Sequence, residues 1–188
     1  MTLRGALQWL FVALIFGFLA KIGSDDLDSG LWGYLLPVAT VLAAVFGLTA
    51  LHEGGHLLAA LALRLKVVAV QVRFTGHSFV QVGPSPAERA LPVRFVLLHL
   101  AGPAVDFAMA FGLFRYASAS MTPLLRGCVL AAGLTAAVLC LGNVLPHRGR
   151  AGVRSDGAQI LQWVFHPERQ RASLAAAAEQ AATFLRTW

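Results

Sequence analysis

Two histidines and a glutamate lie within the otherwise apolar run TALHEGGHLLAALALRLK, residues 49–66. His52 and His56 are four residues apart, so on a helix they share one face and could hold a zinc ion together. Glu53 completes an H-E-x-x-H pattern and could take a proton from a water that zinc makes more acidic. Because inserting a glutamate into an apolar span costs on the order of 3 kcal/mol, a metal site explains these residues better than packing does.

Gly54 and Gly55 lie between the two histidines. A glycine inside a helix lowers helix stability by about 1 kcal/mol relative to alanine, so the presence of two glycines requires an explanation. We expect the glycines to leave room beside a metal ion, and close packing of a neighbouring helix is a second interpretation.

A catalytic zinc site needs a third protein ligand and an open coordination position. The candidates in or beside apolar segments are His99, Asp106 and Asp156. His56 lies about 12 Å of helix before Arg64, and Asn143 lies at a similar depth, five residues before Arg148. Pro146 should end the helix that carries Asn143. A carboxylate from the GVRSDG segment that follows could then turn back toward the metal.

The elements that position these residues are predicted to be membrane spans. The chain of 188 residues is 57% hydrophobic and only 13% charged, whereas soluble domains carry about 25% charged residues. This composition predicts a protein embedded in a lipid bilayer. In such a protein, the net charge of +6 indicates orientation in the membrane and not binding to nucleic acid. We predict an all-α membrane protein with about four transmembrane helices, over residues 5–22, 34–63, 94–115 and 125–146. Pro37 is expected to mark where regular helix begins in the second span.

Three smaller elements are predicted outside the spans. Alternating apolar residues in VVAVQVRF and FVQV predict a β-hairpin over residues 67–82, in the loop after the second span. The stretch DGAQILQWVF predicts a helix over residues 156–165, which His166 and Pro167 end. Residues 1–165 would form the membrane domain, and residues 166–188 an amphipathic helix on its cytoplasmic face.

The basic residues predict the orientation in the membrane. The loop over residues 64–94 has five basic residues, and three arginines follow the fourth span. The loop over residues 21–30, in contrast, has one lysine and three aspartates. Since basic loops stay in the cytoplasm, we expect a multi-pass protein of the inner (plasma) membrane with both termini and the middle loop in the cytoplasm.

The pattern of motifs resembles the site-2 protease family of intramembrane zinc metalloproteases, in particular a small bacterial member. HEGGH stands in one span, AGPAVD in the next, and NVLP precedes SDG, so the motifs cover residues 45–165. The resemblance implies a zinc metalloendopeptidase with one zinc ion per chain, which hydrolyses a peptide bond of a transmembrane protein substrate in regulated intramembrane proteolysis. It also implies roles for five residues: His52, His56 and Asp156 as zinc ligands, Glu53 as the general base, and Asn143 as a group that supports the substrate or transition state.

The chain departs from the family pattern at two places. Asn143 and Asp156 are 13 positions apart, where the family often has a shorter step. The family's G-P-x-x-N motif here ends in Asp106 instead of asparagine. Asp106 could support a ligand imidazole or could hydrogen-bond a neighbouring helix. Gly102, Pro103 and Pro146 are further candidates for contacts around the ligands or with substrate.

The sequence is also compatible with three other functions. The chain could be a catalytically inactive scaffold with the family fold, a zinc transporter or sensor, or a membrane zinc protease of another class. The last would take its third ligand from Glu168 or Glu179. We expect His99 to be structural, and His77 and His147 to be solvated loop residues. No feature of the sequence predicts an oligomeric state.

Overall fold

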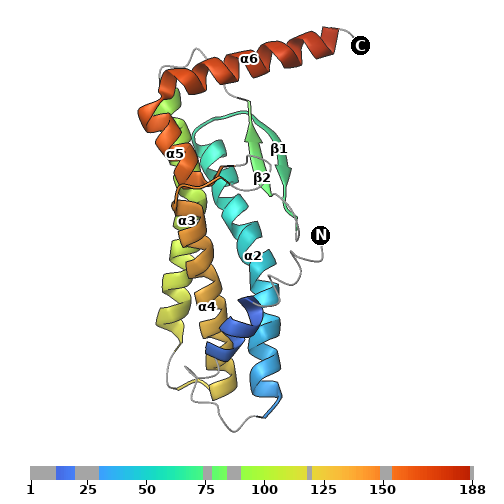
Figure 1. Cartoon of the computed structure of the whole chain (residues 1–188), viewed down its shortest axis with the longest axis vertical. Helices are drawn as coiled ribbons and strands as arrows, with labels where there is room; N and C mark the ends of the chain where they lie inside the picture. The colour runs from blue at the N-terminus through green and yellow to red at the C-terminus, as the bar shows by residue number, and fades with distance from the viewer. Residues whose placement is uncertain are drawn as a thin grey trace.

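The computed structural model describes residues 12–19, 30–73, 78–83, 90–117, 120–148 and 154–186. These residues form a mostly helical protein with a small two-stranded sheet. Three long helices run side by side along the molecule: α2 (Trp32–Ala62), α3 (Leu91–Tyr116) and α4 (Pro123–Val144) (Figure 1). Each is long and apolar enough to cross a membrane.

The predicted spans over residues 34–63, 94–115 and 125–146 correspond to α2, α3 and α4, with ends that differ by three residues or fewer. Most of the predicted span over residues 5–22 lies outside the described residues. Its described part, residues 12–19, is helical. The described part of the chain therefore supports three candidate spans, and the expected total of about four is not established.

The expectation for Pro37 is wrong, because α2 begins at Trp32 and continues through the proline. Pro37 lies in the second turn and lacks an N–H, so only the carbonyl of Gly33 loses its helical partner. Gly33 also has no side chain to crowd the proline ring. The fully buried Pro37 therefore packs inside the bundle without ending the helix.

The predicted hairpin is present next to the end of α2 (Figure 1). Strand β1 (Val67–Gln71) pairs antiparallel with β2 (Phe79–Val82), and Val67 lies opposite Val82. A bulge between Val67 and Ala69 shifts the register. The turn over residues 74–77 lies outside the described residues.

Helix α5 (Asp156–Phe165) has the predicted bounds and packs against α3. Trp163 is buried and lies 4.5 Å from Phe95, measured between ring centroids. The core around this pair also contains Ala60, Leu65, Leu91 and Leu98. This packing fixes the position of α5, and with it the position of Asp156 at its first turn.

Helix α6 (Pro167–Arg186) follows directly after His166, as the His-Pro pair predicted. It lies across one end of the three-helix bundle (Figure 1). An amphipathic helix in this orientation would run along a membrane surface if α2, α3 and α4 cross the membrane.

Candidate metal centre

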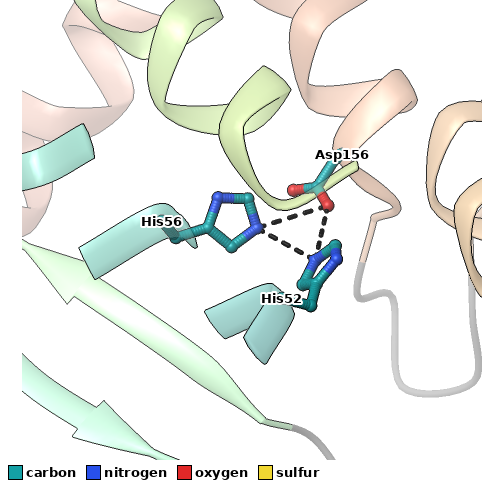
Figure 2. A group of neighbouring side chains, drawn as sticks. All are labelled: His52, His56 and Asp156. Atoms are coloured by element: carbon teal, nitrogen blue, oxygen red, sulfur yellow. Dashed lines mark hydrogen bonds and ion pairs between the residues drawn. The ribbon is translucent and has the colours of Figure 1, made fainter. Parts of the chain in front are cut away.

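His52 and His56 project from one face of α2 toward Asp156 at the start of α5 (Figure 2). Nε2 of His52 lies 3.0 Å from Nε2 of His56. Oδ2 of Asp156 lies 3.1 Å from the first nitrogen and 3.4 Å from the second. Among the described residues, this is the group of three side chains that could hold a metal ion.

The end of α4 brings Asp156 to the histidines. Helix α4 ends at Val144, just before Pro146, as predicted. The hydroxyl of Ser155 donates a hydrogen bond to the carbonyl of Leu145 at 2.8 Å and accepts one from the Ala158 N–H, so it caps α5. A Cβ atom at Gly157 would overlap the Val144 carbonyl oxygen. Glycine at this position therefore lets the start of α5 lie directly against the end of α4.

Helix α3 holds the outer nitrogen of each imidazole. Nδ1 of His52 donates to Oδ2 of Asp106 at 2.8 Å, and Nδ1 of His56 donates to the backbone carbonyl of Leu98 at 2.7 Å. In a neutral imidazole, a proton on Nδ1 leaves a lone pair on Nε2. The two Nε2 lone pairs and a carboxylate oxygen thus converge, an arrangement that a proton or a cation stabilises.

Both imidazoles also press against the backbone of α3 at Gly102. A Cβ atom there would lie 2.5 Å from Nε2 of His56 and 2.6 Å from Nε2 of His52. No side chain larger than hydrogen fits at Gly102 without moving Nε2 of His52 and Nε2 of His56. Gly102 is therefore part of the site because its lack of a side chain leaves space for the two imidazoles.

The spacing of the three donor atoms fits a divalent metal ion. Donors bound to tetrahedral zinc at about 2.05 Å lie about 3.3 Å from one another. An octahedral ion with similar bond lengths gives about 2.9 Å. The observed separations of 3.0, 3.1 and 3.4 Å lie close to both values. The distances therefore suit a metal ion but do not select which one.

Asp156 has the charge that a metal ligand needs. Burial tends to raise the pKa of its carboxyl, but contacts with the imidazoles of His52, His56 and His99 outweigh burial and hold that pKa below its usual range. The carboxyl is therefore ionised at neutral pH, the form that binds metal.

Glu53 and Asn143 border the metal group. Glu53 is buried, and its Oε2 has no hydrogen-bond partner among the described residues. It lies near enough to interact electrostatically with both histidines and with Asp156. Asn143 Nδ2 donates to Oδ2 of Asp106 at 3.2 Å. Asp106 thus contacts His52, which fits support of a ligand imidazole, and Asn143 on α4, which fits a hydrogen bond to a neighbouring helix.

The remaining predicted residues differ in burial. Pro103 is buried inside α3, while Pro146 and Glu168 are exposed. His147 is exposed, as predicted, but His77 and the side chain of Glu179 lie outside the described residues.

The two glycines between the histidines have different surroundings. A Cβ atom at Gly55 would come within 2.8 Å of the Ala101 carbonyl oxygen and of Val105, so this glycine lets α2 and α3 approach closely. A Cβ at Gly54 would meet nothing within 4 Å. Helix packing therefore explains Gly55, while the open space around Gly54 decides between neither of the two interpretations.

One residue of the site was missed. His99, which was expected to be structural, donates from Nδ1 to Oδ1 of Asp156 at 3.1 Å. It lies on α3, three residues before Gly102. The available signal was an ionisable side chain in an apolar span, at helical spacing from Gly102 and Asp106.

Comparison of the chain with known proteins gave no relative: no protein-family model, curated protein or solved structure matches it.

Proposed function

We propose that this protein is an intramembrane zinc metalloprotease that hydrolyses a peptide bond of a transmembrane protein. The observation that carries the proposal is the group formed by His52, His56 and Asp156, together with buried Glu53, whose Oε2 has no hydrogen-bond partner in the described part of the chain. These polar groups are enclosed by helices that are apolar enough to cross a membrane. Buried ionisable groups are costly there, so they are expected to serve a function.

His52, His56 and Asp156 would hold the zinc ion, which when bound would polarise the scissile carbonyl and make an attacking water more acidic. Glu53 accepts a proton from the water as the water oxygen bonds to the carbonyl carbon. Glu53 then passes this proton to the amide nitrogen as the C–N bond breaks. One new carboxyl and one new amino group result, so the atoms balance.

Asn143 has a second amide hydrogen besides the one directed at Asp106. This hydrogen could be donated to the peptide oxygen as negative charge develops on it. Asp106 and the Leu98 carbonyl keep Nε2 of each imidazole free for the metal. Each of these residues has a task that matches its observed contacts.

The substrate would be a membrane protein, cut near the end of the bundle where the hairpin, α5 and α6 lie (Figure 1). A helical substrate would need to unwind to expose its peptide bonds, and an edge of the hairpin could bind the extended segment. The basic loops favour the cytoplasmic side of the plasma membrane for this end. The activity would then be a step of regulated intramembrane proteolysis.

Metal content tests the proposal first. We would measure zinc in the detergent-purified protein and in His52→Ala and Asp156→Ala, with His147→Ala as the control because His147 is an exposed histidine outside the group. About one zinc per chain is expected in the wild type and the control, and much less in the other two. Full zinc in Asp156→Ala would move the third ligand elsewhere.

Proteolysis is tested next on reporter proteins with a single transmembrane segment, reconstituted with the enzyme in liposomes. Cleavage by the wild type and not by Glu53→Gln would support the protease. Zinc binding without cleavage of any reporter would favour an inactive scaffold.

A further inference from the structure

The two oxygens of the Asp156 carboxylate have different partners. Oδ2 faces Nε2 of His52 and Nε2 of His56, and it is the oxygen of the metal group. Oδ1 accepts a hydrogen bond from Nδ1 of His99 at 3.1 Å. A carboxylate can bind a metal through one oxygen or through both. The partner of Oδ1 therefore bears on how Asp156 would bind.

His99 is itself held in place by its neighbours. Its ring lies 6.1 Å from Phe95 and 6.2 Å from His56, measured between ring centroids. Its side chain is 18% exposed and that of Asp156 is 13% exposed, so the pair is largely shielded from water. A hydrogen bond to a charged group is stronger in such a place than at the surface.

The contact completes a pattern on α3. The inner atoms of the candidate ligands face one another, while each outer atom is bound by α3: Nδ1 of His52 by Asp106, Nδ1 of His56 by the Leu98 carbonyl, and Oδ1 of Asp156 by His99. His52 and His56 already share a helix, so their spacing is set by α2. Asp156 comes from a separate element, and His99 is the side chain of α3 that ties it to the bundle.

We propose that His99 is a positioning residue of the metal site, which holds Oδ1 of Asp156 so that the carboxylate offers the metal Oδ2 alone. Binding through one oxygen leaves a coordination position open, as a catalytic site requires. This inference rests on the metal site of the proposed function, and not on the proteolytic activity.

The test compares three substitutions in the full-length protein in detergent. His99→Leu removes the donor. His99→Asn keeps an N–H at the position of Nδ1, because Nδ2 of asparagine is the same number of bonds from the backbone. His99→Gln carries its amide one bond farther out, near the position of Nε2. His147→Leu is the control, since it removes an exposed histidine outside the site.

Zinc affinity is measured by competition with a chelator, and coordination by the visible absorption bands of bound Co²⁺, which depend on ligand number and geometry. Losing a partner of a metal ligand lowers metal affinity about 10–100-fold, so we expect this loss in His99→Leu and His99→Gln. We expect His99→Asn and the control to bind zinc within about threefold of the wild type and to keep its Co²⁺ spectrum.

The outcomes separate the possible roles of His99. Unchanged affinity and spectrum in His99→Leu would overturn the inference and leave His99 as a packing residue. An affinity of His99→Asn as low as that of His99→Leu would also overturn it, and would favour His99 as a direct ligand. If His99→Leu does not fold, the comparison of His99→Asn with His99→Gln decides. No metal binding by the wild type would overturn the proposed function, and this inference with it.

Discussion

Replacing Gly102 with alanine tests the geometry of the metal centre with a single methyl group. Gly102 lies in the interior of α3, where alanine stabilises a helix by about 1 kcal/mol relative to glycine. By propensity alone, the substitution should therefore strengthen the fold. The surroundings predict the opposite effect on the site, because the new methyl group would face Nε2 of both histidines.

The size of the effect follows from the distances. The Cβ atom would lie 2.5 Å from Nε2 of His56 and 2.6 Å from Nε2 of His52, whereas ordinary contacts begin at 3.4 Å. The imidazoles would have to move away by about 0.8 to 0.9 Å, although metal–ligand distances tolerate only about 0.2 Å. The ring atoms cannot yield independently, since Asp106 and Leu98 hold their outer nitrogens. We expect zinc affinity to fall by about 100-fold or more, beyond the loss from one supporting contact.

The assay is zinc competition with a chelator, together with thermal unfolding of the metal-free protein. Gly112→Ala is the matched control, because Gly112 also lies inside α3 but a Cβ there would meet nothing within 4 Å. The control should bind zinc like the wild type. If Gly102→Ala keeps wild-type zinc affinity, His52 and His56 do not bind metal through Nε2 in the observed arrangement, and the reasoning fails.

Three further substitutions should separate the roles of the surrounding residues. Glu53→Gln should keep zinc but lower the rate of reporter cleavage by about 100-fold or more, since a general base is lost; a rate near that of the wild type would exclude this role. Asp106→Ala should lower zinc affinity about 10–100-fold, because His52 loses the acceptor of its Nδ1 proton, and unchanged affinity in the chelator assay would show that this contact is dispensable. Trp163→Ala should lower the free energy of unfolding by about 3–5 kcal/mol and weaken zinc binding too, since Trp163 packs α5 against α3; thermal unfolding and chelator competition measure the two effects.

The elements of this fold could be predicted because their signals are local. Hydropathy marks the three long helices within a few residues, and strict alternation of apolar residues marks the hairpin. The pairing of His52 with His56 follows from helical periodicity alone. Pro37 was misjudged because its effect depends on one carbonyl, that of Gly33, and a single lost bond near the start of a helix does not end it.

The surroundings of the metal group could not be predicted in the same way. The contacts of His99 with Asp156 and of His56 with Leu98 join residues that are 57 and 42 positions apart. They depend on how α3 is placed against α5 and against α2, which periodicity does not determine. A backbone carbonyl such as that of Leu98 also leaves no trace in the sequence, because every residue has one.

Two glycines on facing helices link the packing of the bundle to the chemistry of the site. Gly55 lets the backbone of α3 approach α2 at Ala101, and Gly102, one residue farther along α3, leaves space for the two imidazoles. If either helix moved outward, the partners on α3 would lose their hydrogen bonds to the histidines together with the close packing. The same approach of α2 to α3 therefore determines both the packing of the bundle and the direction in which Nε2 of His52 and Nε2 of His56 point. In a membrane, where helices associate through close packing more than through the hydrophobic effect, a metal centre held from a neighbouring helix depends on that packing.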